Sequence, residues 1–120
     1  MKKVLIVDDE ESILSIITEY LAMCDEDLRI ITATDGKRAM EIMESSASID
    51  LVITDLRMPV MDGFELIRYM AERHPETPVI AMSGDSDPGR IEQLNVENPF
   101  RYIEKPFLFE DLAMMVEGLI

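Results

Sequence analysis

The sequence predicts a doubly wound α/β fold built on a five-stranded parallel sheet. Five short apolar segments recur along the 120 residues, and a segment with helical spacing follows each of them. Strict alternation of strand and helix implies parallel strands, because a parallel pair needs a crossover connection that is usually a helix. Right-handed crossovers then place helices on both faces of the sheet.

The five strands are expected where apolar residues form short continuous runs. Such runs, rich in β-branched residues, are typical of strands that are buried on both faces. The first is the clearest, because all four residues from Val4 to Val7 are aliphatic. In chain order the predicted strands cover residues 4–7, 29–33, 51–54, 79–82 and 100–103.

The five helices are expected where apolar residues return every three or four positions. Ile13, Ile17 and Leu21 mark the first helix in this way, and Phe64, Ile67 and Met70 mark the third. The predicted helices cover residues 13–21, 36–43, 64–71, 88–94 and 109–119. The fourth is expected to be short or irregular, because Pro88-Gly89 opens it and few apolar residues follow.

Composition limits the function classes. A chain of 120 residues with 48% hydrophobic residues fits one domain, over residues 1–120, and argues against disorder. The net charge of −14 argues against direct binding to nucleic acid or an anionic membrane, since both are polyanions. One cysteine, Cys24, permits no internal disulfide, and the apolar run after Lys2-Lys3 is too short for a signal peptide. A cytoplasmic location is therefore expected.

The carboxyl ends of the predicted strands carry the residues that suggest chemistry. Asp8 and Asp9 follow the first strand, Asp55 the third, Ser83 the fourth and Lys105 the fifth. In an open α/β sheet these ends lie along one edge, and ligands bind in the crevice beyond it. We therefore expect three carboxylates, a hydroxyl and an ammonium group to meet there.

Two interpretations of the acids are open at this point. An aspartate after a strand is often a turn residue or a helix N-cap, and Asp9 or Ser12 could cap the first helix. Alternatively, clustered carboxylates repel one another, and a fold tolerates them most readily around a hard cation. The set offers oxygen ligands without His or Cys, which suits Mg²⁺, Ca²⁺ or Mn²⁺ rather than Zn²⁺.

Several motifs occur in the same order as in one known family. They are Val7-Asp8-Asp9-Glu10, Asp50-Leu51-Val52-Ile53-Thr54-Asp55-Leu56-Arg57-Met58-Pro59, Met61-Asp62-Gly63, Pro78-Val79-Ile80-Ala81-Met82-Ser83-Gly84 and Tyr102-Ile103-Glu104-Lys105-Pro106-Phe107. Over residues 3–119 the chain resembles the CheY-like receiver domains of two-component response regulators. The resemblance implies a flavodoxin-like fold with five strands in the order 2-1-3-4-5.

The resemblance also implies a role for each acid. Asp55 would be the phosphoacceptor. Asp9 and Asp55 would bind Mg²⁺, or Mn²⁺, together with the backbone carbonyl of Arg57, and Asp8 would act through metal-bound water. Arg57 and Asp85 occupy positions that tune the lifetime of the phosphoryl group in the family.

Three further roles follow from the same resemblance. Ser83 would donate a hydrogen bond to a phosphoryl oxygen, and Lys105 would pair with another. Tyr102 would be the aromatic residue that turns inward on activation. The Lys105-Pro106 peptide bond would be cis, and Pro59 and Gly63 would shape the loop after the third strand.

The implied partners are a sensor histidine kinase or phosphotransfer protein and a downstream target, or an effector domain missing from this chain. The signal would leave through the face formed by the fourth helix, fifth strand and fifth helix. That face departs from the pattern, because residues 95–101 lack the usual Gly-Ala pair. The acceptor would not be a conventional enzyme, beyond self-phosphorylation and autodephosphorylation.

Three other functions stay open from the sequence. A receiver-like interaction module would bind its partner without phosphorylation. A small phosphatase would need a second acid–base carboxylate, for which there is no clear candidate. A flavin-binding protein would need a phosphate loop after the first strand, where this chain carries acids. Outside these functions, His74 is expected to be a solvated helix-end residue, and Met114-Met115 is the segment that suggests a partner face.

Overall fold

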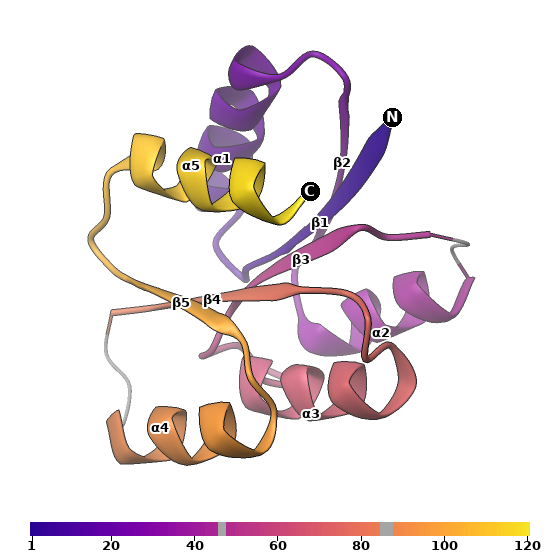
Figure 1. Ribbon diagram of the computed structural model, residues 1–120, viewed down its shortest axis with the longest axis vertical. Coiled ribbons are helices and arrows are strands. Elements are labelled where there is room, and N and C mark those ends of the chain that lie inside the picture. Colours follow the sequence, from indigo (N-terminus) through magenta and orange to yellow (C-terminus); the bar gives the residue numbers. More distant parts are fainter. Residues whose placement is uncertain (46–47, 85–87) are drawn as a thin grey trace.

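The computed structural model describes residues 1–45, 48–84 and 88–120, in which strands and helices alternate (Figure 1). The strands are β1 (Lys2–Val7), β2 (Leu28–Ala33), β3 (Leu51–Asp55), β4 (Val79–Ser83) and β5 (Arg101–Glu104). The helices are α1 (Glu11–Cys24), α2 (Gly36–Ser45), α3 (Gly63–Arg73), α4 (Pro88–Glu97) and α5 (Phe109–Leu119).

The five strands form one parallel sheet in the order β2-β1-β3-β4-β5. Helices α1 and α5 cover one face, and α2, α3 and α4 cover the other (Figure 1). This arrangement confirms the predicted flavodoxin-like fold. No helix in the described ranges has the length and apolar character that crossing a membrane requires.

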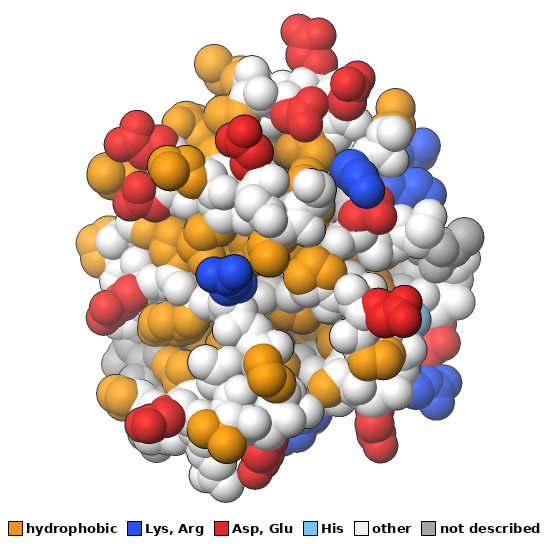
Figure 2. Space-filling view, viewed as in Figure 1, with side chains coloured by type: hydrophobic (Ala, Val, Ile, Leu, Met, Phe, Trp, Pro, Cys, Tyr) orange, Lys and Arg blue, Asp and Glu red, His pale blue; other side chains and the backbone are white. Residues whose placement is uncertain are grey.

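The acidic composition is visible on the surface. Figure 2, in the same view as Figure 1, shows Asp and Glu side chains spread around the face, with hydrophobic side chains exposed among them. Two of the exposed hydrophobic side chains are those of Met114 and Leu108, on α5 and just before it.

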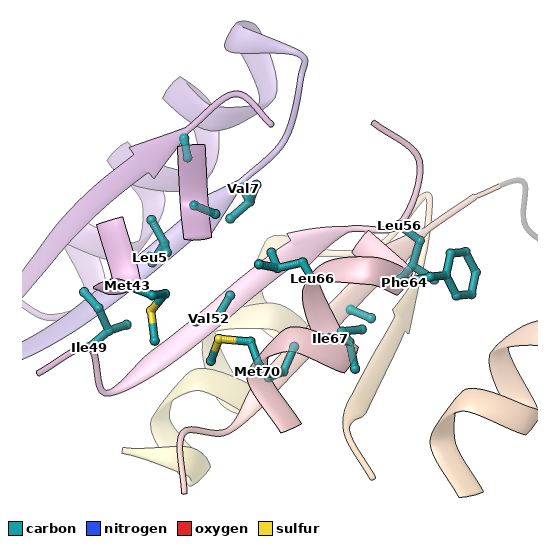
Figure 3. Close-up of a cluster of buried hydrophobic side chains, with 14 of the residues drawn as sticks. Leu5, Val7, Met43, Ile49, Val52, Leu56, Phe64, Leu66, Ile67 and Met70 are labelled. Carbon is teal, nitrogen blue, oxygen red and sulfur yellow. The ribbon is translucent and has the colours of Figure 1, made fainter. Parts of the chain in front are cut away.

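Alternation along the strands divides the apolar side chains between two cores. In β1, Leu5 and Val7 face α2 and α3, whereas Val4 and Ile6 face α1 and α5. Figure 3 shows the first of these cores, in which Val52 from β3 lies among side chains of α3. Because both faces are covered, the central strands are apolar over most of their length, as the continuous runs predicted.

The fourth helix differs from the prediction. It is a regular ten-residue helix, Pro88–Glu97, rather than a short or irregular segment over residues 88–94. Leu94 is its one buried residue, and Val96, the apolar residue that follows it in the last turn, is exposed. The backbone amide of Asn98 donates to Leu94 O at 2.7 Å, which closes that turn.

The fifth strand starts one residue later than predicted, at Arg101 instead of Phe100. The amide of Phe100 donates to the side-chain Oδ1 of Asn95 at 2.9 Å, and this bond joins it to α4. The apolar run that predicted the strand therefore includes a residue of the preceding loop.

Candidate functional site

The strand register brings Asp8 and Asp55 to the same edge of the sheet. Val7 pairs with Thr54 across β1 and β3, so the residues that follow, Asp8 and Asp55, lie at the same level. The backbone amide of Lys105 donates to Ser83 O at 2.9 Å, which continues the pairing of β4 with β5. Residues far apart in sequence thus meet where their strands end.

Asp8 is fully buried, at 0% exposure. Its Oδ1 accepts a hydrogen bond from the amide of Glu10 at 2.9 Å, and its Oδ2 accepts one from Lys105 Nζ at 3.3 Å. Burial raises the pKa of Asp8, and the hydrogen bond from Glu10 and the charge of Lys105 offset this only partly. The carboxylate is therefore costly to keep ionised without further positive charge.

Asp55 ends β3 and is 8% exposed. Its Oδ1 accepts from the amide of Leu56 at 2.9 Å and lies 3.6 Å from Lys105 Nζ. Burial raises the pKa of Asp55 from 3.8 to about 6. The charge of Lys105 lowers this pKa, the nearby Asp8 raises it, and the amides of Leu56 and Arg57 lower it. Desolvation therefore outweighs the attraction of one ammonium group.

Lys105 joins the two carboxylates. Its side chain is only 23% exposed, which rules out an ordinary surface lysine. Burial would lower the pKa of Lys105, but Asp55 and Asp8 together outweigh burial and raise it. The ammonium group is thus a fixed positive charge between two acids. The Lys105-Pro106 bond is cis, as predicted.

The donor set fits a hard divalent cation. Carboxylate oxygens of Asp8, Asp9 and Asp55 all lie within 4.8 Å of one another, and Asp9 is exposed while the other two are buried. Three carboxylates and one lysine leave an excess of negative charge, and oxygen ligands suit Mg²⁺ or Mn²⁺. Arg57, whose carbonyl was the fourth predicted ligand, lies two residues after Asp55 with its side chain exposed.

The capping interpretation of the acids is not supported. The N-cap residue of α1 is Glu10, not Asp9 or Ser12, and no side chain makes a capping hydrogen bond there. Asp8 does bond the amide of Glu10, but it does so from the end of the strand. Its buried carboxylate also faces Lys105, which a capping role does not require.

Ser83 and Tyr102 lie next to each other beside the acidic cluster. Ser83 is buried at the end of β4, and its carbonyl accepts a hydrogen bond from the Tyr102 hydroxyl at 3.2 Å. Tyr102 is 36% exposed on β5, so it is not a core residue. Asp85, the second position predicted to tune the phosphoryl lifetime, lies outside the described residues.

The remaining predicted residues lie apart from this site. His74 is half-buried at the end of α3, where its Nε2 lies 3.1 Å from the Tyr69 hydroxyl, so it is not simply solvated. Cys24 is exposed at the end of α1. Met114 is exposed, whereas Met115 packs against the core between the sheet, α1 and α5.

The sequence did not indicate several close contacts around the site. A Cβ on Gly84 would lie 3.0 Å from Lys105 Cβ, so a glycine there makes room for the lysine. Arg90 on α4 lies over the Phe64 ring at 3.9 Å and 3.7 Å from Asp62 Oδ2, which ties α4 to the start of α3. Such contacts join residues distant in sequence and have no local signature.

The loop between β3 and α3 contains a strained turn. Val60 has a φ of 70°, and the amide of Met61 donates to Pro59 O at 2.8 Å around it. A γ-turn with positive φ is rare and strained, and a β-branched residue is especially unfavourable there. Met61 O in turn accepts from the amide of Gly36, so α2 holds the turn in place.

Replacing Val60 by glycine is expected to stabilise the protein by about 1 kcal/mol, because glycine adopts positive φ without steric strain. Urea unfolding would measure the change. Val60→Ala is the matched control, since it removes the exposed apolar methyls but keeps Cβ. A gain as large for alanine as for glycine would mean that surface hydrophobicity, not backbone strain, is the cause.

Comparison with known proteins identifies this arrangement. The family model described as "Response regulator receiver domain" matches residues 4–117. The chain belongs to the response regulator receiver domain family. Receiver domains are signalling modules of two-component systems and not conventional enzymes.

Curated relatives support the assignment. The chain is 34% identical over 117 residues to the DNA-binding transcriptional regulator NtrC of Escherichia coli, covering 96% of this chain and 24% of that protein. It is 31% identical to the transcriptional regulatory protein CpxR of E. coli, covering 100% of this chain and 50% of that one. The chain thus spans between a quarter and a half of these relatives.

Solved receiver domains match the whole fold. A response regulator receiver domain protein from Clostridium thermocellum is 30% identical, with a TM-score of 0.87 and coverage of 100% of this chain and 94% of that chain. The chemotaxis response regulator CheY4 of Vibrio cholerae is 28% identical, with a TM-score of 0.84 and coverage of 100% and 99%.

Proposed function

We propose that this receiver domain accepts a phosphoryl group on Asp55 in a reaction that depends on a divalent metal ion. The observation that carries the proposal is the position of Lys105, whose ammonium group lies 3.6 Å from Asp55 and 3.3 Å from Asp8. A buried acceptor carboxylate beside one fixed cation and two further acids is the arrangement that phosphoryl transfer requires.

The reaction is a displacement at phosphorus. A carboxylate oxygen of Asp55 forms the new O–P bond while the N–P bond of a phosphohistidine donor breaks, and the departing imidazole keeps the electron pair and takes up a proton. Asp55 must be ionised to act as the nucleophile. Its raised pKa makes that state costly in the protein alone, so added positive charge favours the reaction.

The protein's own groups supply position and charge. Asp8, Asp9 and Asp55, with the backbone carbonyl of Arg57, would hold Mg²⁺ or Mn²⁺, and Lys105 would neutralise a phosphoryl oxygen. The metal ion, when bound, would supply positive charge to the phosphoryl oxygens. Ser83, buried at the end of β4, would donate a hydrogen bond to another phosphoryl oxygen.

Phosphorylation would change partner binding through the surface of α4, β5 and α5. Ser83 links the acceptor to this surface, because its carbonyl accepts the hydrogen bond of Tyr102 on β5. A movement of Ser83 toward a phosphoryl group would alter that bond and shift the population of Tyr102 positions. The phosphodonor would be a sensor histidine kinase or a phosphotransfer protein, and the target a protein or an attached effector domain.

One relative makes a kinase partner plausible. The Vibrio harveyi protein named autoinducer 1 sensor kinase/phosphatase LuxN is 34% identical over 103 residues, which are 86% of this chain and 12% of that protein. The phosphorylation-independent alternative has lost the observation that motivated it, since α4 is a regular helix.

Intact-mass measurement tests the proposal directly. Incubation with acetyl phosphate and Mg²⁺ is expected to add the mass of one phosphoryl group, and chelation of the metal ion should prevent the addition. Asp55→Asn should remove it completely, because the amide lacks the nucleophilic oxygen. Asp50→Asn is the matched control and should still be phosphorylated, since Asp50 lies at the other end of β3, where its Oδ2 accepts from the amide of Lys3.

Absence of added mass in the wild type would contradict the proposal, as would addition that survives Asp55→Asn. Partner binding that is unchanged by acetyl phosphate and by Asp55→Ala would favour the interaction-module alternative. Repeated turnover of a phosphomonoester would favour the phosphatase, and absorbance in the visible flavin bands would favour the flavin-binding protein.

A further inference from the structure

A second concave surface lies at the opposite end of the sheet from Asp55. It is a groove of about 550 Å³ between α1 and α5, and it includes Lys2 and Leu28, the first residues of β1 and β2. Its hydrophobic lining includes Tyr20, Leu21, Leu28, Ala113, Met114 and Val116. A groove of this volume is large enough for several apolar side chains.

The groove carries excess negative charge. Asp25, Glu110 and Glu117 line it, and Lys2 is the one cationic residue among its lining residues in the described chain. None of the three acids forms an ion pair with another described residue. Their charges are therefore available to a partner that carries positive charge.

The acids on α5 have a regular spacing. Glu110 and Glu117 are seven residues apart, which is about two helical turns or roughly 10 Å along the axis. Ala113 and Met114 lie between them at three- and four-residue spacing, so all four share one side of α5. The side of α5 that lines the groove is thus an apolar centre flanked by two carboxylates.

The exposed methionine suits an adaptable contact. Met114 is 69% exposed although it lies beside the apolar floor of the groove. Its flexible, polarizable side chain can repack around different apolar groups. Figure 2 shows acidic and hydrophobic side chains close together over the region where α1 and α5 lie in Figure 1.

We propose that the groove between α1 and α5 binds a basic amphipathic helix of a partner protein. The apolar side of that helix would pack over Met114 and Leu28, and two Lys or Arg residues seven positions apart would pair with Glu110 and Glu117. This is the helix-in-groove mode of peptide recognition, in which both charge and shape would determine specificity.

The net charge argues against the other occupants. A second copy of this chain also carries −14, so two copies repel each other, and the same repulsion disfavours nucleic acid and anionic lipid. The groove is at the amino-terminal end of the sheet, so binding there leaves Asp8 and Asp55 accessible. The inference therefore does not rest on phosphorylation of Asp55.

A designed peptide tests the proposal on the intact chain. The probe is a fluorescein-labelled helical peptide of about sixteen residues, which is roughly four helical turns. It carries leucines on one side and two lysines seven positions apart. We expect fluorescence anisotropy to show saturable binding at physiological salt. A peptide with glutamates in place of the two lysines should not bind.

Charge reversal in the protein should weaken binding of the lysine peptide. The double variant Glu110→Lys/Glu117→Lys is expected to lower its affinity on the order of tenfold or more, because two attractions become repulsions. Glu72→Lys/Glu92→Lys makes the same change in net charge at exposed positions on α3 and α4, and it should bind almost as the wild type does. Circular dichroism would verify that both variants are folded.

Three results would overturn the proposal. The first is that the lysine and glutamate peptides bind equally well, or that neither peptide binds. The second is equal weakening by the two double variants, which would indicate nonspecific attraction to an acidic protein. The third is self-association of the chain in sedimentation experiments that Met114→Glu abolishes, because the groove would then belong to a second copy.

Discussion

Replacing Gly63 by alanine is expected to destabilise the protein by about 3 kcal/mol or more. A Cβ at this position would lie 2.2 Å from Asp55 O and 2.7 Å from Leu56 Cα, both backbone atoms. No rotamer change can relieve such an overlap, so either α3 or the end of β3 must move. If the end of β3 moves, it carries Asp55 with it, so the same change should also displace this proposed phosphoacceptor from Lys105.

Urea unfolding of Gly63→Ala and wild type would measure this loss. Gly118→Ala is the matched control, because a Cβ at Gly118 has no atom within 4 Å. Gly118 lies near the end of α5, where alanine has the higher helix propensity, so that variant should gain up to about 1 kcal/mol. A loss below about 1 kcal/mol for Gly63→Ala would mean that the helix can tilt away at little cost.

The position of the acidic site could be predicted because it depends on local patterns. An apolar run buried on both faces ends where the chain becomes polar, and Asp8 and Asp55 are the first charged side chains after their runs. A parallel sheet then brings strand ends to one edge without further information. The same logic gave the order of elements and assigned the correct residues to most of them.

The end of α4 and the start of β5 could not be predicted, because they depend on single polar contacts. Asn95 accepts a hydrogen bond from the amide of Phe100, and Asn98 donates to Leu94 O. Neither contact leaves a periodic signal, and both lie in a segment with few apolar residues. A hydrophobic pattern therefore underestimates the length of a helix whose last turn is exposed.

The backbone conformation after Asp55 could not be predicted from the sequence either. Pro59 and Gly63 were expected to shape the loop after β3, but Val60 offers no sign that it adopts a positive φ. The turn around Val60 is fastened to α2 by the hydrogen bond from the Gly36 amide to Met61 O. Gly36 and Gly63 likewise lie so close to the backbone of Met61 and Asp55 that a Cβ would overlap it. Such close packing is a tertiary property that the sequence does not indicate.

The resemblance to receiver domains placed residues that physical patterns could not. Tyr102 was singled out as a switch residue only through the family motif, and in the structure its hydroxyl donates a hydrogen bond to Ser83 O. Similarly, the cis Lys105-Pro106 bond came from the motif and not from spacing. The acids at the strand ends, by contrast, pointed to a cation without any family.

Asp55→Asn is expected to stabilise the metal-free protein near pH 7.5 and to lose most of that advantage near pH 5. Burial raises the pKa of Asp55 to about 6, above 3.8 in the unfolded chain. Between these values the folded protein binds the proton more tightly, so the contribution of Asp55 to stability falls as pH rises through about 6. A shift of this size corresponds to about 3 kcal/mol near neutral pH.

The variant should therefore gain about 2 kcal/mol near pH 7.5, because asparagine removes the ionisation cost but also the attraction of Lys105. Near pH 5 the wild-type carboxyl is largely protonated, and the difference should shrink to under about 1 kcal/mol. Urea unfolding in the presence of a chelator at both pH values would measure it. Asp27→Asn removes an exposed acid from the loop after α1 and controls for the general relief of negative charge.

Adding Mg²⁺ should make the wild type more stable than Asp55→Asn near pH 7.5, which reverses their order of stability without metal. A divalent ion among Asp8, Asp9 and Asp55 competes with protons, so it should stabilise the wild type more at pH 7.5 than at pH 5. Asp55→Asn lacks one of the three carboxylates and should gain less from the ion. If Mg²⁺ stabilised the wild type and Asp55→Asn equally, Asp55 would not be a ligand. If Asp27→Asn gained as much stability as Asp55→Asn in the absence of metal, burial of Asp55 would not be the source of the pH dependence.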